Sequence, residues 1–486
     1  MALLEPGETC WRIDRAHRAA FLIDAQAYFS AVREALAAAQ RSVFLLGWAF
    51  DPRTRLAPDG MESGHEPDQI GQMLIDLAAK RPELDIRLLI WRSALPIALT
   101  QEFFPHRARN WFEGSGIKFR LDDETPLAAC HHQKALVVDD QLAFCGGADF
   151  GVDRWDTTAH LDVDYRRIDP DHTAHPPRHE VMALVDGPAA QALGDLARER
   201  WRRATGEVLT PPIAGGDPWP PSVVPELGEV GVGLARTEPA WHGRPAVREW
   251  EALTLRSIAE AKRSLYIENQ YFTAPSVAEA LARRLAEPKG PEIVLVTSER
   301  SPSYFDRFTM DRARGVALRR LREADVFGRF RALHPVTAEG RPIIVHAKLM
   351  LVDDRLARIG SGNLNNRSGG LDTECEVAIE AKDRDGRAAI ARLRHRLIAH
   401  YLGRTADDLD GALARSRSLI RAIEALNRNG RLKDIAAPTT GRLTRLVASY
   451  HLGDPLGVED AWRPWRRKKM LDRAVHAIAA RKIQAS

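Results

Sequence analysis

Long apolar segments and cysteine are both scarce in this chain of 486 residues. Apolar runs such as 43–50 and 343–352 are far shorter than the ~20 residues that a membrane-spanning helix needs. The four cysteines show no CxxC pairing, which excludes a cysteine-dense scaffold and favours reduced thiols. Residues 1–18 carry three carboxylates and no apolar stretch, so we expect no secretory signal. These absences predict a cytoplasmic protein, soluble or peripheral at a membrane.

Lysine is also rare, with 11 residues among the 70 basic ones, which makes any lysine-containing motif improbable by chance. The pattern His-x-Lys-x-x-x-x-Asp nevertheless occurs twice. One copy runs from His132 through Lys134 to Asp139, and the other from His346 through Lys348 to Asp353. Each is followed at the same distance by a glycine-containing turn, 146–149 and 360–363. Two such copies indicate a duplicated catalytic unit.

Overall composition sets wide limits. Hydrophobic residues make up 44% of the chain and charged residues 28%, enough for substantial cores in two or three domains. The net charge of +4 suits an anionic partner such as a membrane surface or a nucleic acid, but it suits an Arg-rich solvated surface equally well. Charge alone therefore does not choose a partner.

The repeat extends beyond the two motifs. Residues 39–50 (AQRSVFLLGWAF) parallel residues 261–272 (AKRSLYIENQYF), and each stretch follows a segment with helical spacing. A further helix and a short apolar strand follow in each half. This alternation predicts an α/β fold. We divide the chain into an N-terminal lobe (1–204), a Pro/Gly-rich linker (205–228), a C-terminal lobe (229–402) and a helical, basic extension (403–486) that ends in a Trp- and Arg-rich stretch at 462–469.

The motif spacing favours a shared site for the two histidines and two lysines. Side chains at i and i+2 of a strand share a face, so each His and its Lys point the same way. With the amide of Asn363, they supply a nucleophile, an acid and a clamp of positive charge, which phosphoryl transfer needs and which requires no metal or other cofactor. Asp139 and Asp353 stand at an odd offset and open turns, so we interpret them as structural.

Each catalytic histidine needs a group that fixes its tautomer. Carboxylates follow the motifs at similar distances, Asp162 or Asp164 in the first half and Asp372 or Glu374 in the second, and we favour Asp164 and Glu374. His131 points away from the face of His132 and is interpreted as structural. The histidines at 172, 175 and 179 lie in a Pro/Asp-rich stretch, so we interpret them as solvated rather than as a metal site.

The paired motifs, with 360–368 (GSGNLNNRS) after the second and Arg154-Trp155-Asp156 after the first, resemble the phospholipase D superfamily. Residues 267–272 (IENQYF) and 185–190 (VDGPAA) resemble its phosphatidylcholine-hydrolysing branch. The resemblance covers about 21–402. It implies two similar α/β/α lobes related by a pseudo-two-fold axis, with the active site at their interface. It further implies a phosphohistidine on His132, with His346 as acid and base. Asp149 stands where the second half has Asn363, and we leave it out of the phosphate clamp.

The expected function is therefore a phosphodiesterase or transphosphatidylase that releases or exchanges the head group of a glycerophospholipid. Its expected partners are a phospholipid surface and a water or small-alcohol acceptor, with no nucleic acid, and we expect a monomer. Three alternatives stay open: a phosphatidyltransferase like cardiolipin synthase, a metal-independent nuclease, and a catalytically inactive lipid-binding scaffold.

Overall fold

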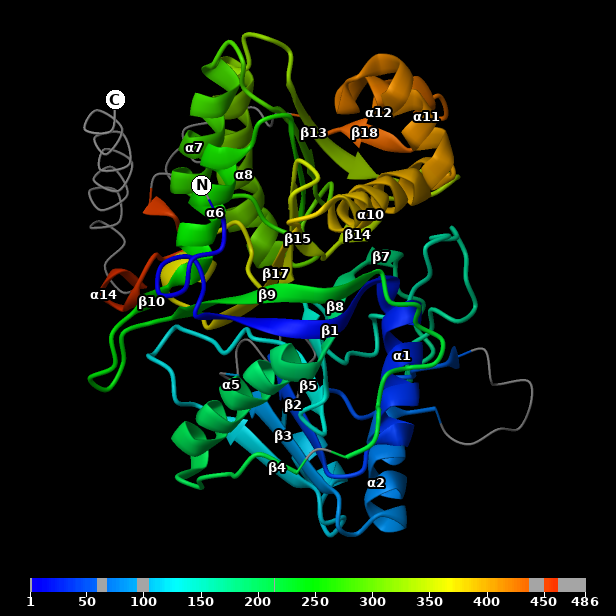
Figure 1. Ribbon diagram of the computed structural model, residues 1–486, viewed down its shortest axis with the longest axis vertical. Helices are drawn as coiled ribbons and strands as arrows, with labels where there is room; N and C mark the ends of the chain where they lie inside the picture. The colour runs from blue at the N-terminus through cyan, green and yellow to red at the C-terminus, as the bar shows by residue number, and fades with distance from the viewer. Residues whose placement is uncertain (1, 59–67, 94–104, 214, 437–449, 462–486) are drawn as a thin grey trace.

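The computed structural model describes residues 2–58, 68–93, 105–213, 215–436 and 450–461, and within them the fold is mixed α/β (Figure 1). Sixteen strands form one continuous sheet, and two short strands form a second, small one. Helices flank the large sheet in both parts of the molecule (Figure 1). The α/β class expected from alternating helices and short apolar strands is thus confirmed.

The first half of the chain forms seven neighbouring strands of the large sheet, in the order β4-β3-β2-β5-β6-β8-β1. Its elements are β1 (Arg12–Ile23), α1 (Asp24–Ala38), β2 (Ser42–Gly47), α2 (Ile70–Lys80), β3 (Asp85–Trp91), α4 (Pro105–Trp111), β4 (Lys118–Asp122), β5 (Ala135–Val138), β6 (Leu142–Gly146), β7 (Arg178–His179), β8 (Val181–Asp186) and α5 (Gly187–Thr205). The three strands at the β4 edge pair in parallel, and the remaining neighbours pair antiparallel.

The second half follows with the order β13-β12-β11-β15-β16-β17-β9. Its elements are β9 (Leu227–Glu238), β10 (Val247–Arg248), α6 (Glu249–Glu260), β11 (Ser264–Asn269), α7 (Pro275–Ala286), β12 (Glu292–Val296), α8 (Tyr304–Ala324), β13 (Phe330–Pro335), β14 (Ile344–Val345), β15 (Lys348–Val352), β16 (Leu356–Gly360), α9 (Asn366–Gly370), β17 (Glu374–Glu380) and α10 (Arg384–Leu402). The three strands at the β13 edge are again parallel to one another and the rest antiparallel.

The two halves meet edge to edge. The long strands β1 and β9 pair antiparallel from Arg12 opposite Leu234 to Ala19 opposite Leu227, so hydrogen bonds run unbroken across the molecule (Figure 1). The two-stranded sheet adds a second junction, because β7 of the first half pairs in parallel with β14 of the second.

The buried hydrophobic residues are also divided between the two halves. One hydrophobic cluster lies within the first half, where Phe29, Phe50 and Phe150 pack against one another. A second lies mainly within the other half. The third contains residues of both halves, including Trp201 of α5 and Leu397 of α10. Each half therefore has its own core, and a shared core backs the junction of β1 with β9.

The described part of the region after α10 is mainly helical and adds one short strand to the large sheet. It contains α11 (Ala406–Ser416), α12 (Leu419–Leu426), β18 (Leu432–Asp434) and α14 (Val458–Ala461). Strand β18 pairs antiparallel with β13 and so adds one more strand to the second half's edge of the sheet. A three-residue strand leaves no periodicity in the sequence, which is why its place was not predicted. The basic stretch 462–469 lies outside the described residues.

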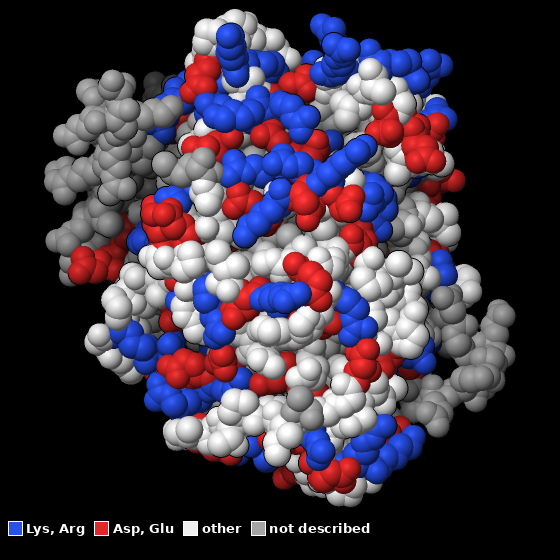
Figure 2. All heavy atoms as spheres, viewed as in Figure 1, with Lys and Arg blue, Asp and Glu red and all other residues white. Residues whose placement is uncertain are grey.

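The structure also bears on the cysteines, on membrane-spanning helices and on surface charge. All four cysteines are free thiols and buried. Among the described residues, every helix is too short or too polar to cross a bilayer. On the face shown in Figure 2, lysine and arginine are interspersed with aspartate and glutamate.

Candidate active site

Asp139 and Asp353, the last residues of the two motifs, hold a chain turn in each half. Oxygens of Asp139 accept hydrogen bonds from the backbone N–H groups of residues 40, 41 and 42 at 2.7–2.8 Å. Asp353 accepts from residues 262, 263 and 264 at 2.7–3.0 Å. Both have positive φ, 55° and 52°. They fix the start of β2 and of β11 and contact no catalytic candidate, so their structural interpretation agrees with the geometry.

The His and Lys of each motif lie at a strand's start rather than within it. β5 begins at Ala135, after His132 and Lys134, while β15 begins at Lys348, after His346. Each histidine instead follows a short segment paired with the other half. The N–H of His132 donates to the carbonyl of Thr373 (3.0 Å), and the N–H of His346 donates to the carbonyl of His179 (2.9 Å). We predicted that each His and its Lys lie within one strand and share its face. This is wrong, because both histidines precede their strands.

His132 is fixed by a carboxylate of the opposite half. Its Nδ1 lies 3.0 Å from Oε2 of Glu374, the first residue of β17. Glu374 also accepts hydrogen bonds from the hydroxyls of Ser361 (2.5 Å) and Ser368 (2.6 Å). Burial raises the pKa of Glu374, but His132 and the two hydroxyls outweigh it and leave the pKa below its usual range. Glu374 is thus an anion that orients Nδ1–H of His132 and turns Nε2 toward the site.

His346, in the second half, is likewise fixed by a carboxylate of the first half. Its Nδ1 lies 2.9 Å from Oε1 and 3.0 Å from Oε2 of Glu180, which follows His179 of β7. Glu180 was not predicted. The expected residue, Asp164, is wrong for this role, because its carboxylate accepts from the backbone and guanidinium of Arg166 at 2.7–3.0 Å. Asp162 and Asp372 also bond elsewhere, to Thr337 and to Arg367.

The two lysines are held in the same way. Nζ of Lys134 donates to the carbonyl of His132 (2.9 Å), and Nζ of Lys348 donates to that of His346 (2.6 Å). Lys134 also lies 3.3 Å from Asp149, whereas Lys348 donates to Oε1 of Gln270 (3.0 Å). Burial lowers the pKa of Lys348 to about 7; Glu180 opposes that shift, and the nearby cations Lys134 and Arg154 reinforce it.

Positive charge also gathers around His346. Burial lowers its pKa well below the usual value, and Lys348, Arg154, Arg178 and Lys134 lower it further. Lysines of both motifs therefore lie close enough to one histidine to perturb it. Such a concentration of cations suits a bound phosphate anion. Arg154 and Arg178 were not among the predicted site residues, although Arg154 belongs to the Arg-Trp-Asp segment that carries the family resemblance.

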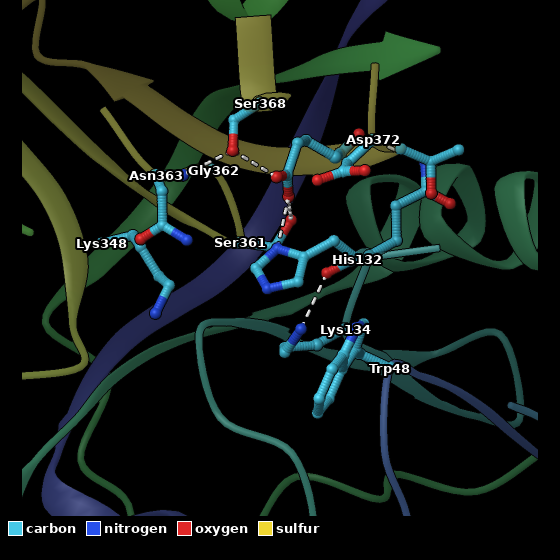
Figure 3. Close-up of polar contacts among 12 residues, drawn as sticks. Trp48, His132, Lys134, Lys348, Ser361, Gly362, Asn363, Ser368 and Asp372 are labelled. Atoms are coloured by element: carbon cyan, nitrogen blue, oxygen red, sulfur yellow. Dashed lines mark hydrogen bonds and ion pairs between the residues drawn. The ribbon is translucent and has the colours of Figure 1, made fainter. Parts of the chain in front are cut away.

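Asn363 and Gly147 complete the lining. Figure 3 places the side chains of Asn363, Lys348 and His132 around one space. The backbone N–H of Asn363 donates to the hydroxyl of Ser368 (3.0 Å), and its buried Oδ1 has no hydrogen-bond partner among the described residues. A Cβ on Gly147 would lie 2.9 Å from Cδ of Lys348 and 3.1 Å from the carbonyl oxygen of His346, so only glycine lets the halves approach this closely.

Residues set aside from catalysis have structural partners. His131 lies 3.0 Å from Asp122 and 3.2 Å from the hydroxyl of Thr373. Asp149 accepts hydrogen bonds from the backbone of residues 48 and 49. Of the three histidines expected to be solvated, His172 is exposed, but His175 and His179 are buried. For His179 the expectation is wrong, because the strand pairing of β7 draws it beneath the surface.

Comparison with known proteins agrees with this geometry. Residues 254–397 match the family model described as "Cardiolipin synthase, PLD-like domain". Phospholipase D A of Dictyostelium discoideum is 24% identical over 427 residues, 74% of this chain and 32% of the relative. Cardiolipin synthase A of Pseudomonas entomophila is 26% identical over 368 residues, 73% of this chain and 63% of the relative. The chain thus spans about a third of the length of the first relative and somewhat under two thirds of the second.

A solved structure is similar along nearly the whole fold. The crystal structure of phosphatidylserine synthase from Haemophilus influenzae superposes with a TM-score of 0.52 at 15% identity, covering 84% of this chain and 95% of that one. The similarity extends the match to both halves of the sheet, beyond the residues that the family model covers. With both motifs intact and these relatives matched over about three quarters of its length, the chain belongs to the phospholipase D superfamily.

Proposed function

We propose that the protein transfers phosphatidyl groups of glycerophospholipids, to water or to a small alcohol, through a phosphohistidine. The observation that carries the proposal is the crossed pairing of His132 with Glu374 and of His346 with Glu180. Each carboxylate orients one imidazole, and two lysine ammonium groups lie beside them. The set provides a nucleophile, a proton carrier and fixed positive charge.

The proposed reaction proceeds in two balanced steps. Nε2 of His132 attacks phosphorus while the bond from phosphorus to the head-group oxygen breaks, and that oxygen takes a proton from His346. Water or an alcohol then gives a proton to His346 and attacks phosphorus, and the phosphorus–nitrogen bond breaks. The free enzyme is restored. Lys134, Lys348 and the amide of Asn363 stabilise the charge on the non-bridging oxygens in both steps.

The charge around His346 supports its assignment as acid and base. In the free protein its pKa is lowered by burial and by four nearby cations. A bound phosphate anion offsets those cations, so the pKa of His346 rises when substrate binds. The histidine then carries a proton when the leaving oxygen needs one. His132, paired with the anionic Glu374, serves as the nucleophile, in agreement with the family resemblance.

We further infer that the two lobes, 1–204 and 229–402, arose by duplication and are related by a pseudo-two-fold axis at the junction of β1 with β9. Support comes from the matching strand order of the halves and from their matching strand directions. The equivalent backbone contacts of Asp139 and Asp353 support it too. Residues 205–228, which contain the segment between α5 and β9, would then be the linker.

The substrate class rests on the relatives. Those named phospholipase D and those named cardiolipin synthase both match, so hydrolysis and phosphatidyl transfer to a lipid alcohol are the two candidate outcomes. A nuclease is less well supported, because acidic and basic residues are interspersed on the face in Figure 2. We propose action at a phospholipid surface by a cytoplasmic monomer.

Lipid profiling tests the proposal. Wild-type protein and the His132→Ala variant are incubated with mixed phospholipid vesicles, with and without ethanol, and the products are identified by mass spectrometry. Phosphatidylethanol from wild type alone would support a covalent phosphatidyl-enzyme. Cardiolipin formed from added phosphatidylglycerol would favour the synthase outcome. Unchanged lipids, together with cleavage of a DNA phosphodiester, would overturn the lipid assignment.

A further inference from the structure

Four side chains unrelated to the reacting groups converge beneath the active site: Asp24, His160, His179 and His400. Each offers one ligand atom, and these atoms all lie within 4.8 Å of one another. Asp24 opens α1, His160 lies between β6 and β7, His179 ends β7, and His400 comes from α10 of the other half. The first three are at most 1% exposed and His400 is half-buried.

Each histidine of this cluster is anchored through its second ring nitrogen. Nδ1 of His160 lies 2.8 Å from Oδ2 of Asp156, and Nε2 of His179 lies 2.7 Å from Oε2 of Glu268. Nδ1 of His400 lies 3.2 Å from the backbone carbonyl of Arg396. Donation to a carboxylate or a carbonyl fixes the tautomer and leaves the other nitrogen with a free lone pair. Metal-binding histidines are held in this way.

The remaining atom of each residue is the one turned toward its neighbours. Nε2 of His160, Nδ1 of His179, Nε2 of His400 and Oδ2 of Asp24 are all buried without a hydrogen-bond partner among the described residues. Oδ1 of Asp24 lies 2.8 Å from Nδ1 of His179, and Oδ2 lies 3.4 Å from Nε2 of His160. Ligand atoms around a tetrahedral zinc ion are separated by about 3.3 Å. In the cluster the four candidate ligand atoms lie within 4.8 Å of one another.

The buried charges around the cluster also favour a bound cation. Asp24, Asp156 and Glu268 bring three buried carboxylates to the cluster, and the Arg167 guanidinium pairs with Asp156. With neutral imidazoles, the group carries an excess of two negative charges; without a metal, a proton on His179 offsets one of them, because burial lowers its pKa but Glu268 and Asp24 raise that pKa to about 10. Buried excess charge is costly unless it is compensated. One divalent cation neutralises it while using the four unpartnered atoms.

We propose that Asp24, His160, His179 and His400 bind one divalent transition-metal ion, and that three imidazole nitrogens with one carboxylate oxygen select Zn²⁺. The site is structural, because its protein ligands complete a tetrahedron and leave no position for substrate. It joins the two halves through His400. It also supports the active site, since Asp24 accepts from the N–H of Glu180 (3.1 Å), and His179 accepts from that of His346.

Metal content tests the site independently of catalysis. Full-length wild type, His400→Ala and His395→Ala are produced in zinc-supplemented medium and desalted, and zinc per chain is measured by plasma mass spectrometry. His395 is the matched control, because it is a buried histidine of the same helix that contacts Arg394 and lies outside the cluster. We expect about one zinc ion per chain in wild type and in His395→Ala, and at least a tenfold loss in His400→Ala.

The visible absorption spectrum of the wild type tests the site without relying on a variant that could fail to fold. Wild type made with Co²⁺ in place of zinc should show the intense visible absorption of a tetrahedral site, and added Zn²⁺ should remove it. Less than a tenth of a zinc ion per chain in wild type, without that absorption, would overturn the proposal. Retention of the wild-type zinc content by a folded His400→Ala, as judged by circular dichroism, would overturn it as well.

Discussion

Nδ1 of His132 and Oε2 of Glu374 lie 3.0 Å apart although 242 residues of chain separate them. The same crossing joins His346 to Glu180 over 166 residues. Neither motif histidine is therefore paired with a carboxylate of its own half. The orientation of each proposed catalytic group depends on docking of the opposite half.

Replacing Glu374 by glutamine should lower kcat at least about 100-fold, because a neutral amide neither fixes the Nδ1–H tautomer of His132 nor stabilises the imidazolium. The control is Glu376→Gln, on the same strand, whose carboxylate accepts from the N–H of Gly362 and contacts no histidine. Steady-state release of head group measures both. Equal activity of the two variants would contradict an orienting role for Glu374.

The contact of Glu180 with His346 leads to a second prediction. Glu180→Gln should lower kcat to a similar extent, since Glu180 contacts Nδ1 of His346. Asp164→Asn should leave kcat within about twofold of wild type, because the carboxylate of Asp164 pairs with Arg166 and not with a motif histidine. The reverse order of effects would restore Asp164 as a histidine-orienting carboxylate.

A variant that lacks the proton acceptor for the second step should accumulate the covalent intermediate. In His346→Asn, His132 can still attack a substrate with a good leaving group such as p-nitrophenol, but no base activates water. We expect one acid-labile, alkali-stable phosphoryl group per chain after rapid quenching, and its position is read by peptide mass spectrometry. A label on a residue other than His132 would exclude His132 as the nucleophile.

The pKa of Lys348 near 7 predicts how substrate capture depends on pH. This pKa is lowered, so the ammonium that holds phosphate is present below pH 7 and is lost as the pH rises above it. We expect kcat/KM of wild type to fall above pH 7, whereas kcat falls less because bound phosphate raises this pKa. Lys348→Arg keeps its charge, so its kcat/KM should lack the descending limb. Superimposable profiles would remove Lys348 from this role.

Asp139→Asn and Asp353→Asn should each lower the free energy of unfolding by about 1–3 kcal/mol, because a charged acceptor of three backbone N–H groups becomes neutral. Asparagine tolerates the positive φ at both positions, so backbone strain should not add to the cost. Urea denaturation measures the loss, which should be additive in the double variant. Loss of turnover by folded protein would instead indicate a catalytic role.

Sequence predicted the parts of this site that repeat. Two rare motifs at matching positions identified His132, Lys134, His346 and Lys348, and the odd offset of Asp139 and Asp353 separated turn formation from catalysis. The tertiary partners were harder to predict. Asp164 and Glu180 both follow the first motif, and only the pairing of β7 with β14 brings the later one to His346. Distance along the chain holds no information about that contact.

The neighbouring sequence also gave wrong predictions for His179 and for the two motif histidines. His179 follows a run rich in proline and aspartate, which is typical of a solvated loop, but a strand pairing across the halves buries it. The motif histidines precede their strands because their N–H groups bond to the opposite half. In both cases the deciding hydrogen bonds are made by residues more than 160 positions away. Periodicity within one segment does not reach that far.

The crossed carboxylates also have a consequence for biosynthesis. A ribosome that has made the whole first half has released His132 and Lys134 without Glu374, which is 242 residues further on. That nascent half can fold its own core, yet its imidazole has no fixed tautomer and no second lysine beside it. The proposed activity can therefore arise only after the second half has been translated and docked, so neither an unfinished nor a truncated chain would attack the lipids of the cell that makes it.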